Sequence, residues 1–248
     1  MYRDERIKMI TEILKQNGYV TVKFLMNELH YSVATINRDL NYMQNQKLIK
    51  RSYGGVELTE SKSVPLVFRY NKMRPSKNKI GQAAAELVQD GDVIFIDGST
   101  TAQYMGKYIT GKKELMVITN NITLASYLSE NNISVVCLGG RIAEPPSMIC
   151  SNETVDHAME YTADKMFFST GGFTPEGKIV NGDMYYMMHK AMRRNSDKAY
   201  FLVDGEKITE SAVHYWGDLS DVDGIITDYV FEDWVKEVYS KTKFIEIK

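Results

Sequence analysis

Hydrophobic residues in the first sixty positions recur at the spacing of short helices. Ile7, Ile10 and Leu14 lie three and four residues apart, as they do on one face of a helix. Two further helices are predicted after Thr21 and Ser32, because each of these side chains can cap a helix N-terminus. The inward face of the third helix is expected to carry Val33, Ile36, Leu40 and Met43.

Two short strands should follow these helices, joined by a turn at Gly54–Gly55. Residues 59–76, which contain two prolines and a basic run, are expected to form a linker. From residue 77 onward, apolar segments alternate with helical segments, and several have no polar face, as in buried parallel strands. The expected strands are residues 93–97, 115–119, 133–138, 165–169, 198–204 and 224–227. This alternation predicts an α/β fold with a Rossmann-like open sheet.

The order helix, helix, turn, helix and hairpin is that of a winged helix-turn-helix, whose last helix enters the major groove of DNA. We therefore expect a DNA-binding domain at residues 3–58 and an effector and oligomerisation domain at residues 77–248. Asn37 can pair with the edge of adenine, and Arg38 with guanine or phosphate. A plain three-helix bundle, or a helix-turn-helix that binds protein, stays open as an alternative. The outward face of the third helix should present Ala34, Thr35, Asn37, Arg38, Asn41 and Tyr42.

The charge of the whole chain gives no indication of nucleic-acid binding, but the charge of one segment does. The chain has 30 lysines and arginines against 32 aspartates and glutamates, a formal charge of −2, so it has no overall basic field. Residues 33–56 hold four basic residues and one acid, which suits a surface that meets phosphates. Two cysteines exclude a disulfide scaffold, and Cys137 is expected in the core. Without a signal-peptide pattern or an apolar run of membrane-spanning length, the expected location is the cytoplasm.

The sharpest local signal for a ligand follows the first strand of the α/β region. Asp97 ends this strand and Gly98 permits a tight turn, after which Ser99, Thr100 and Thr101 open a helix. Amides at a helix start, together with three hydroxyls, suit a phosphate. The alternative is that Ser99 or Thr100 only caps the helix. The segment has neither the Walker pattern nor a dinucleotide fingerprint.

Polar residues also end other strands, and the carboxyl ends of parallel strands meet at one edge of a sheet. Lys207 and Arg141 can neutralise a phosphate, while carboxylates and amides can accept hydrogen bonds from sugar hydroxyls. The candidate ligand-binding residues are Asp97, Gly98, Ser99, Thr100, Thr101, Asn120, Gly140, Arg141, Gly172, Asp204 and Lys207. Each of them alone has a structural explanation as a turn or a cap. The four histidines are scattered, so no metal site is expected.

The segment SVATINRDLNYMQNQKLIKRSYGG resembles the signature of DeoR-type transcriptional regulators. The later segments DGDVIFIDGSTT, VITNN, CLGGR and VDGEK are similar to the effector domain of the same family. The resemblance places Arg51 and the Gly54–Gly55 wing at the DNA backbone, and Asp97–Thr101 and Lys207 at the effector phosphate. The full set of candidate DNA contacts is Ser32, Thr35, Asn37, Arg38, Asn41, Arg51, Gly54 and Gly55.

The sequence departs from the family pattern at three places. Tyr31 replaces a valine, Asn37 replaces the first of two paired arginines, and Cys150–Ser151 stand where a glycine is usual. The Asn37 change bears on which DNA sequence is bound, and the Cys150–Ser151 change on the choice of effector. The resemblance implies a fold similar to ribose-5-phosphate isomerase and a phosphorylated sugar or sugar derivative as effector.

Together these patterns favour a DNA-binding transcriptional regulator whose DNA affinity is modulated by a phosphorylated sugar. The resemblance implies that it is a repressor of a carbohydrate-metabolism operon. The expected partners are operator DNA, the effector and further copies of the chain in a homodimer or homotetramer, with no membrane. No catalytic residue and no cofactor is expected. One alternative is a sugar-phosphate isomerase or transferase with a helical appendage, in which Asp97 or Asp204 would act as general base. Another is a protein-interaction module with a vestigial pocket.

Overall fold

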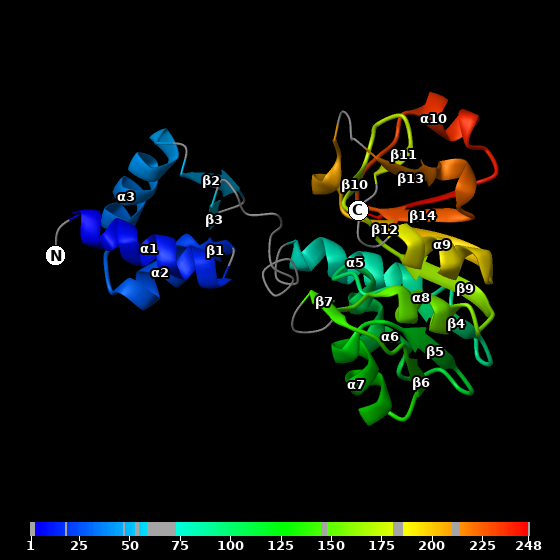
Figure 1. Ribbon diagram of the computed structural model, residues 1–248. Coiled ribbons are helices and arrows are strands. Elements are labelled where there is room, and N and C mark those ends of the chain that lie inside the picture. Colours follow the sequence, from blue (N-terminus) through cyan, green and yellow to red (C-terminus); the bar gives the residue numbers. More distant parts are fainter. Residues whose placement is uncertain are drawn as a thin grey trace. The chain divides into compact units, whose positions relative to one another are not determined.

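The computed structural model describes residues 3–17, 19–46, 48–52, 55–58, 73–144, 148–180, 186–209 and 214–247. The chain forms two compact units, residues 1–72 and 73–248 (Figure 1). The expected linker at residues 59–76 extends too far, because helix α5 begins at Arg74. Pro75 lies in the first turn of α5, where a proline is tolerated.

The first unit is a winged helix-turn-helix. Its helices are α1 (Arg3–Asn17), α2 (Val22–Leu29) and α3 (Val33–Asn45), and its strands are β1 (Tyr19–Thr21), β2 (Ile49–Ser52) and β3 (Gly55–Leu58). The strands form an antiparallel sheet in the order β1-β3-β2. The hairpin of β2 and β3 was predicted, whereas β1 was not. Three residues between two helices are too few to show an alternating pattern.

The helices of this unit begin where their caps predict. The Thr21 hydroxyl accepts a hydrogen bond from the Phe24 amide at 3.1 Å, and Ser32 Oγ accepts one from the Thr35 amide at 3.2 Å. Val33 was expected to face inward, but it is 49% exposed, because it is the first residue of α3 and adjoins the exposed turn. The core of the unit consists of Ile10, Leu14, Val20, Leu25, Leu29, Ile36, Leu40, Met43, Ile49 and Val56.

A buried ion pair joins α1 to α3. Arg6 Nε lies 2.6 Å from Asp39 Oδ2, and Arg6 Nη2 lies 3.0 Å from Asp39 Oδ1, so the contact is bidentate. The Asp39 side chain is fully buried, and its hydrogen bond raises the pKa of Arg6 above the usual value. Asp39 therefore belongs to the interior of the unit, while its neighbour Arg38 is exposed.

Seven parallel strands form the central sheet of the second unit, which confirms the predicted α/β open sheet. In spatial order they are β15 (Lys243–Glu246), β14 (Gly224–Thr227), β12 (Ser196–Val203), β9 (Ala163–Phe168), β4 (Val93–Ile96), β5 (Met116–Thr119) and β6 (Ser134–Cys137). The chain runs outward from β4 through β5 and β6, and then returns to β9 on the other side of β4. The switch point between β4 and β9 is where open α/β sheets bind ligands.

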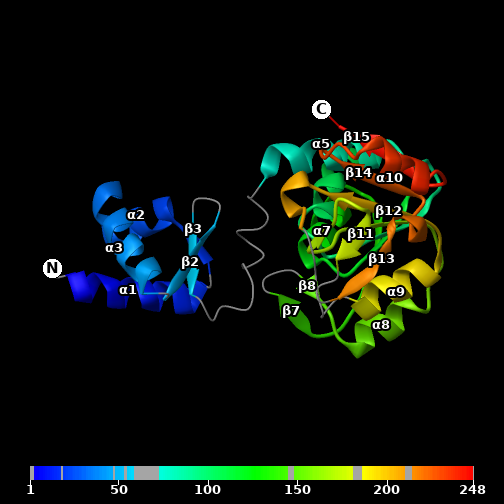
Figure 2. The same cartoon turned by 90° about the horizontal axis from the view of Figure 1, so that it is seen from above.

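Helices cover both faces of this sheet. One face packs against α5 (Arg74–Ala85), η1 (Ala102–Met105), α6 (Gly106–Ile109) and α7 (Ile122–Glu130). The other face packs against α8 (Asn152–Ala158), α9 (Tyr186–Arg194) and α10 (Asp233–Val238). Figure 2 shows α8 and α9 together on the opposite side of the unit from α5. Within β4, Phe95 points into one core and Ile94 and Ile96 into the other, as alternation along a strand requires.

Several short elements escaped prediction. An antiparallel sheet of β10 (Gly172–Phe173), β11 (Lys178–Val180) and β13 (Tyr215–Asp218) packs on the same face as α9. A small hairpin consists of β7 (Ile142–Glu144) and β8 (Met148–Ile149), and single turns form η2 (Gly205–Lys207) and η3 (Leu219–Asp221). These short strands lack the continuous apolar runs by which the central strands were recognised.

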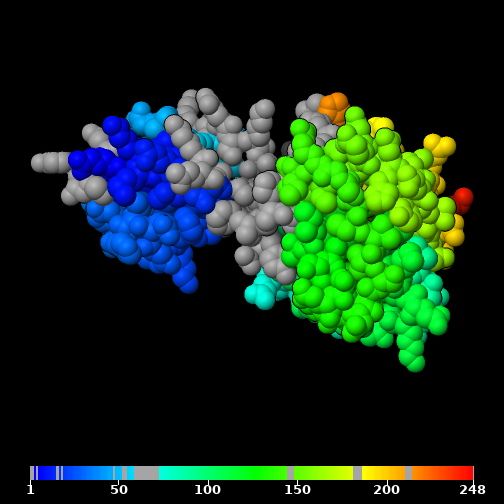
Figure 3. Space-filling view, turned by 60° about the horizontal axis from the view of Figure 1, so that its bottom comes forward, coloured from blue at the N-terminus to red at the C-terminus, as the bar shows by residue number. Residues whose placement is uncertain are grey.

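The β6 side of the central sheet is an edge. Figure 3 shows one face of the second unit, formed largely by the green to yellow-green segment from β5 to α8. Cys137 ends β6 and is exposed, which corrects the expectation that it lies in the core. An edge strand is paired on one side only, so its end residue has less cover than a central one.

In the part of the chain that the structure describes, no helix is long and apolar enough to cross a membrane.

Candidate nucleic-acid interface and ligand site

Polar side chains gather on the outward face of α3. Arg38 and Asn41 are exposed, and Thr35 and Asn37 are partly exposed. Ser32 Oγ lies 3.0 Å from Thr35 Oγ1, so both hydroxyls are engaged at the helix start. The structure thus brings these five candidate DNA contacts to one surface, and their contacts with DNA stay a prediction.

Arg51 ties the hairpin to this face. Its Nη1 donates to Asn41 Oδ1 at 2.5 Å, and its Nη2 donates to Asn37 Oδ1. Gly55 is a buried residue of β3, and a Cβ atom there would lie 2.3 Å from Tyr19 Cζ of β1. Close packing against β1 therefore explains this glycine, while Gly54 lies outside the described residues.

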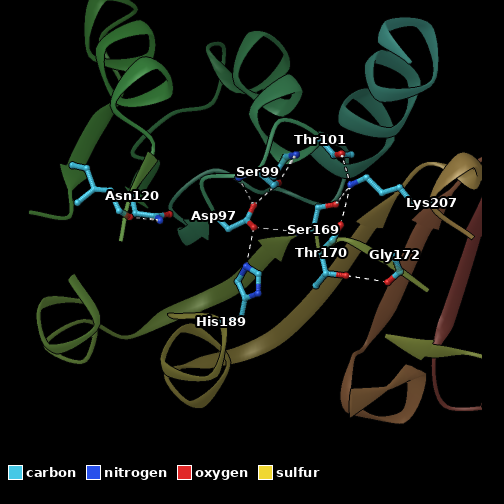
Figure 4. Close-up of polar contacts among 11 residues, drawn as sticks. Asp97, Ser99, Thr101, Asn120, Ser169, Thr170, Gly172, His189 and Lys207 are labelled. Carbon is cyan, nitrogen blue, oxygen red and sulfur yellow. Dashed lines mark hydrogen bonds and ion pairs between the residues drawn. The ribbon is translucent and has the colours of Figure 1, made fainter. Parts of the chain in front are cut away.

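A second group of polar side chains lies at the switch point of the central sheet (Figure 4). Asp97 directly follows β4 and is 3% exposed. Its Oδ1 accepts hydrogen bonds from Ser99 Oγ at 2.5 Å and from the Ser99 amide at 3.2 Å. Its Oδ2 accepts one from the Ser169 amide at 3.2 Å and lies 2.9 Å from His189 Nε2. Asp97, expected to receive ligand hydroxyls, is thus occupied within the protein and positions the turn.

The turn after Asp97 is held in place by packing and capping. A Cβ atom on Gly98 would lie 2.5 Å from Met148 Cγ of β8, so any larger residue would require the Met148 side chain to shift. Ser99 Oγ accepts a hydrogen bond from the Ala102 amide at 3.1 Å. The cap alternative therefore describes Ser99, whereas the hydroxyls of Thr100 and Thr101 meet lysines instead.

Two lysine side chains from distant parts of the sequence reach these threonines. Lys77 of α5 is buried, and its Nζ donates to Thr100 Oγ1 at 3.1 Å. Lys207 of η2 places its Nζ 3.4 Å from Thr101 Oγ1 and 3.0 Å from Ser169 Oγ. Both ammonium groups therefore flank one turn that begins beside the switch point.

Two neighbouring strand ends supply acceptor atoms. Asn120 follows β5 and is 1% exposed; its Nδ2 donates to the Ile149 carbonyl at 2.7 Å. Asp204 follows β12 and is 2% exposed. Within the described residues, Asn120 Oδ1 and Asp204 Oδ2 are buried oxygens without a hydrogen-bond partner. Buried polar atoms in proteins are nearly always bonded, so these two oxygens call for donors from outside the chain.

The remaining candidates have other surroundings. The Arg141 side chain is exposed, and its backbone bonds to Cys150 and to Ser151 Oγ. Gly140 has φ +136°, and a Cβ atom there would lie 2.2 Å from Thr154 Oγ1. Gly172 approaches the Lys207 carbonyl so closely that a Cβ atom would lie 2.5 Å from it. The structure thus brings Gly172 to the lysine end of the site, while Arg141 is linked through its backbone to Cys150, beside the residue that Asn120 bonds.

Lys77, Ser169 and His189 were not identified from the sequence. Lys77 lies at the end of the basic run that marked the expected linker, and it shares the buried face of α5 with Ile80 and Ala84. That spacing of three and seven residues was a detectable signal. His189 lies on the buried face of α9, but nothing local connects it to Asp97, which is 92 positions away in sequence.

A winged helix-turn-helix joined to an α/β unit with polar strand ends defines a class of protein, the ligand-responsive DNA-binding regulators. The model of the DeoR-like helix-turn-helix domain matches residues 6–62, and that of the DeoR C-terminal sensor domain matches residues 72–229. The chain belongs to the DeoR family. It is therefore a DNA-binding transcriptional regulator, and not the isomerase that the sequence left open as an alternative.

Characterised relatives are similar over nearly their whole length. The HTH-type transcriptional repressor GlcR of Bacillus subtilis is 29% identical over 231 residues, which cover 92% of this chain and 89% of the relative. The glycerol-3-phosphate regulon repressor of Escherichia coli is also 29% identical over 231 residues, covering 92% of each chain.

Similar solved structures include two kinds of protein. Ribose 5-phosphate isomerase from Plasmodium falciparum aligns with a TM-score of 0.42 at 14% identity, over 57% of this chain and 55% of the isomerase. The eIF2B beta subunit from Chaetomium thermophilum aligns with a TM-score of 0.49 at 14% identity, over 88% of this chain and 66% of the subunit. Similarity this distant says nothing about function.

Proposed function

We propose that this regulator is a repressor of a carbohydrate-metabolism operon and that a phosphorylated sugar, bound at the switch point of the second unit, changes its affinity for operator DNA. It acts as a homodimer or homotetramer in the cytoplasm, because paired half-sites in operators require paired DNA-binding units. Two relatives named as repressors, one of them of a glycerol-3-phosphate regulon, support the direction of control and the kind of effector.

The observation that carries the proposal is the pair of ammonium groups at one turn. Lys77 Nζ and Lys207 Nζ contact Thr100 and Thr101, which are adjacent in the chain. A phosphate monoester is a dianion at neutral pH, and two lysines with two hydroxyls supply both its charge balance and its hydrogen bonds. Asp97 Oδ2 is turned toward the Ser169 amide and His189 Nε2, so its carboxylate is engaged within the protein.

The acceptor atoms favour a polyhydroxylated ligand over a simple phosphate. Asn120 Oδ1 and Asp204 Oδ2 can only accept hydrogen bonds, and sugar hydroxyls are donors of matching size. A buried acceptor that stays unbonded costs about 1–3 kcal/mol, and a ligand that satisfies it recovers this free energy. The effector would therefore present hydroxyl groups on either side of its phosphate.

The regulatory effect requires only modest coupling. A coupling free energy of about 1–3 kcal/mol between effector and DNA changes DNA affinity about 5- to 150-fold. The effector need not touch the DNA-binding unit, provided that it binds one arrangement of the oligomer better than another.

A thermal-shift screen tests the proposal. The screen compares ribose 5-phosphate, hexose 6-phosphates, triose phosphates, the unphosphorylated sugars and inorganic phosphate. Binding is detectable as a rise in melting temperature, because a ligand at 100 times its Kd stabilises the native state by about 2.7 kcal/mol. We expect one phosphorylated sugar to raise the melting temperature, Lys207→Met to abolish the shift and Lys178→Met to keep it. Lys178 is the matched control, because it pairs with Asp218 on β13 and contacts none of the site residues. A normal shift in Lys207→Met would refute the assigned site.

A further inference from the structure

We propose that Arg51 determines the base preference of α3 by holding the side-chain oxygens of two asparagines toward itself and turning their NH2 groups away, so that this face of the helix selects guanine over adenine. The proposal concerns the DNA-binding unit alone and does not depend on the effector or its site. It also replaces the expectation that Asn37 pairs with the edge of adenine.

The geometry starts from three side chains on two elements. Asn37 and Asn41 are four residues apart on α3 and therefore lie one above the other on the same face. Arg51 stands on β2, where it pairs with Val56 across the hairpin. Its two terminal nitrogens each donate to the side-chain oxygen of one asparagine. One guanidinium thus holds both amide groups at once.

The chemistry of these groups fixes the orientation of the amides. A guanidinium has five N–H donors and no acceptor, so an asparagine facing it must present its oxygen. The NH2 groups of Asn37 and Asn41 are then turned away from Arg51. Arg51 itself keeps three N–H groups beyond the two that it donates to the asparagines. The groups that these three side chains turn away from their mutual contact are therefore N–H donors.

A donor-only edge distinguishes between the purines in the major groove. Guanine presents two acceptors there, N7 and O6, whereas adenine presents the acceptor N7 beside the donor N6 amine. Asparagine normally recognises adenine with both amide atoms, its oxygen accepting from the amine. Because Arg51 turns both oxygens toward itself, the adenine amine would face the NH2 groups of the two asparagines. Guanine matches the edge at both of its acceptors.

The test compares base preferences in selections from randomised duplexes. Asn37→Ala first identifies the base that Asn37 contacts, as the position where preference disappears. At that position we expect the wild-type protein to favour guanine over adenine by about tenfold, within the range of a specific major-groove contact. Arg51→Met releases both oxygens and should reduce this ratio or reverse it in favour of adenine.

Two further variants keep the result decisive. Lys50→Met removes a neighbouring exposed cation of β2 and should weaken binding equally on all sequences, leaving the guanine preference intact. Asn37→Asp keeps an oxygen for Arg51 but removes the NH2 donor, so it should lose the preference for guanine even where Arg51→Met fails to fold. A wild-type preference for adenine at the Asn37 position, or an unchanged guanine preference in Arg51→Met or Asn37→Asp, would overturn the proposal.

Discussion

The two groups of candidate functional side chains differ most in their exposure. On α3, Arg38 and Asn41 are exposed, whereas Thr101 and Asn120 at the strand ends are 0% and 1% exposed. A duplex approaches only the surface of a protein, while a small molecule is held best by polar groups already removed from water. Substitutions on the outward face of α3 should therefore change DNA binding with little effect on stability. Substitutions at the strand ends should separate into those that destabilise the fold and those that weaken ligand binding.

Asp97 and Asp204, both in the buried group, differ in their hydrogen bonds. Both directly follow a parallel strand, and both are almost fully buried. Asp97 binds Ser99, Ser169 and His189, whereas Asp204 keeps an oxygen without a partner among the described residues. Burial alone therefore does not distinguish a ligand contact from a structural residue.

The largest effect should come from the buried ion pair of the first unit. Arg6→Met leaves the Asp39 carboxylate buried and unpaired, which typically costs about 3–5 kcal/mol. Urea unfolding of the DNA-binding unit, followed by circular dichroism, measures the loss. Arg38→Met is the matched control, because Arg38 is exposed and its replacement should change stability by less than about 0.5 kcal/mol. If Arg6→Met and Arg38→Met lowered the free energy of unfolding equally, Arg6 and Asp39 would contribute no more to stability than an exposed residue does.

Asp97→Asn should follow in size. Charge-assisted hydrogen bonds contribute about 1.5–3 kcal/mol, and the neutral amide cannot accept from Ser99, Ser169 and His189 as the carboxylate does. We expect the free energy of unfolding of the second unit to fall by about 2–3 kcal/mol. Denaturant titration without effector measures this, and wild-type stability in Asp97→Asn would mean that the carboxylate does not hold the turn.

Asp204→Asn should behave in the opposite way. Since one of its oxygens lacks a partner, the neutral side chain should leave the stability of the ligand-free protein within about 0.5 kcal/mol of wild type. Its affinity for the effector should fall about tenfold, because a charged acceptor is lost. Isothermal titration calorimetry with the effector from the thermal-shift screen measures the affinity. Unchanged binding would exclude Asp204 from the ligand site.

Arg38→Met should weaken DNA binding about five- to tenfold and reduce the slope of log K against log salt by about 1, as the loss of one phosphate contact does. Fluorescence anisotropy with a labelled duplex at several salt concentrations gives both quantities. An unaltered affinity and slope would mean that the outward face of α3 does not meet the DNA.

The smallest effect concerns pH. Burial opposes ionisation of Asp218, but hydrogen bonds from Ser220 and the ammonium of Lys178 outweigh it and lower the pKa of this carboxyl below its usual value. A lowered pKa in the folded state stabilises the protein above the unfolded pKa of about 3.9, and this stabilisation is lost as pH falls through the folded pKa. Asp218→Asn should cost less than about 1 kcal/mol at pH 7. In urea unfolding, that difference should stay constant down to about pH 4.5; a decline between pH 6 and 5 would contradict the assignment.

The sequence predicted whatever is encoded locally or by a regular period. The caps at Thr21 and Ser32, the core face from Ile36 to Met43 and six of the seven central strands follow from neighbouring residues. β15 was missed because its two apolar residues, Phe244 and Ile245, stand between charged residues and do not form an apolar run like those of the other central strands.

The contacts within the sites could not be predicted in the same way. Candidate residues were selected by their position at strand ends, and by that criterion Asp97 and Asp204 are equally good ligand-binding candidates. Their difference depends on His189, which approaches Asp97 from α9. The role of Arg51 likewise depends on the register of β2 against α3, which no short-range pattern reveals. Long-range packing therefore decides which candidate is bonded within the protein and which has an unused atom.

The most direct measurement is the affinity for operator DNA with and without a phosphorylated sugar, in the wild-type protein and in Lys207→Met. A duplex obtained by selection from randomised DNA serves as the operator in a fluorescence-anisotropy titration. The account predicts that one phosphorylated sugar weakens wild-type binding at least about fivefold. Lys207→Met should bind the same duplex equally well and not respond to the sugar. The account would be contradicted if no phosphorylated sugar changed the wild-type affinity for DNA by more than about twofold. An undiminished response to the sugar in Lys207→Met would contradict it as well.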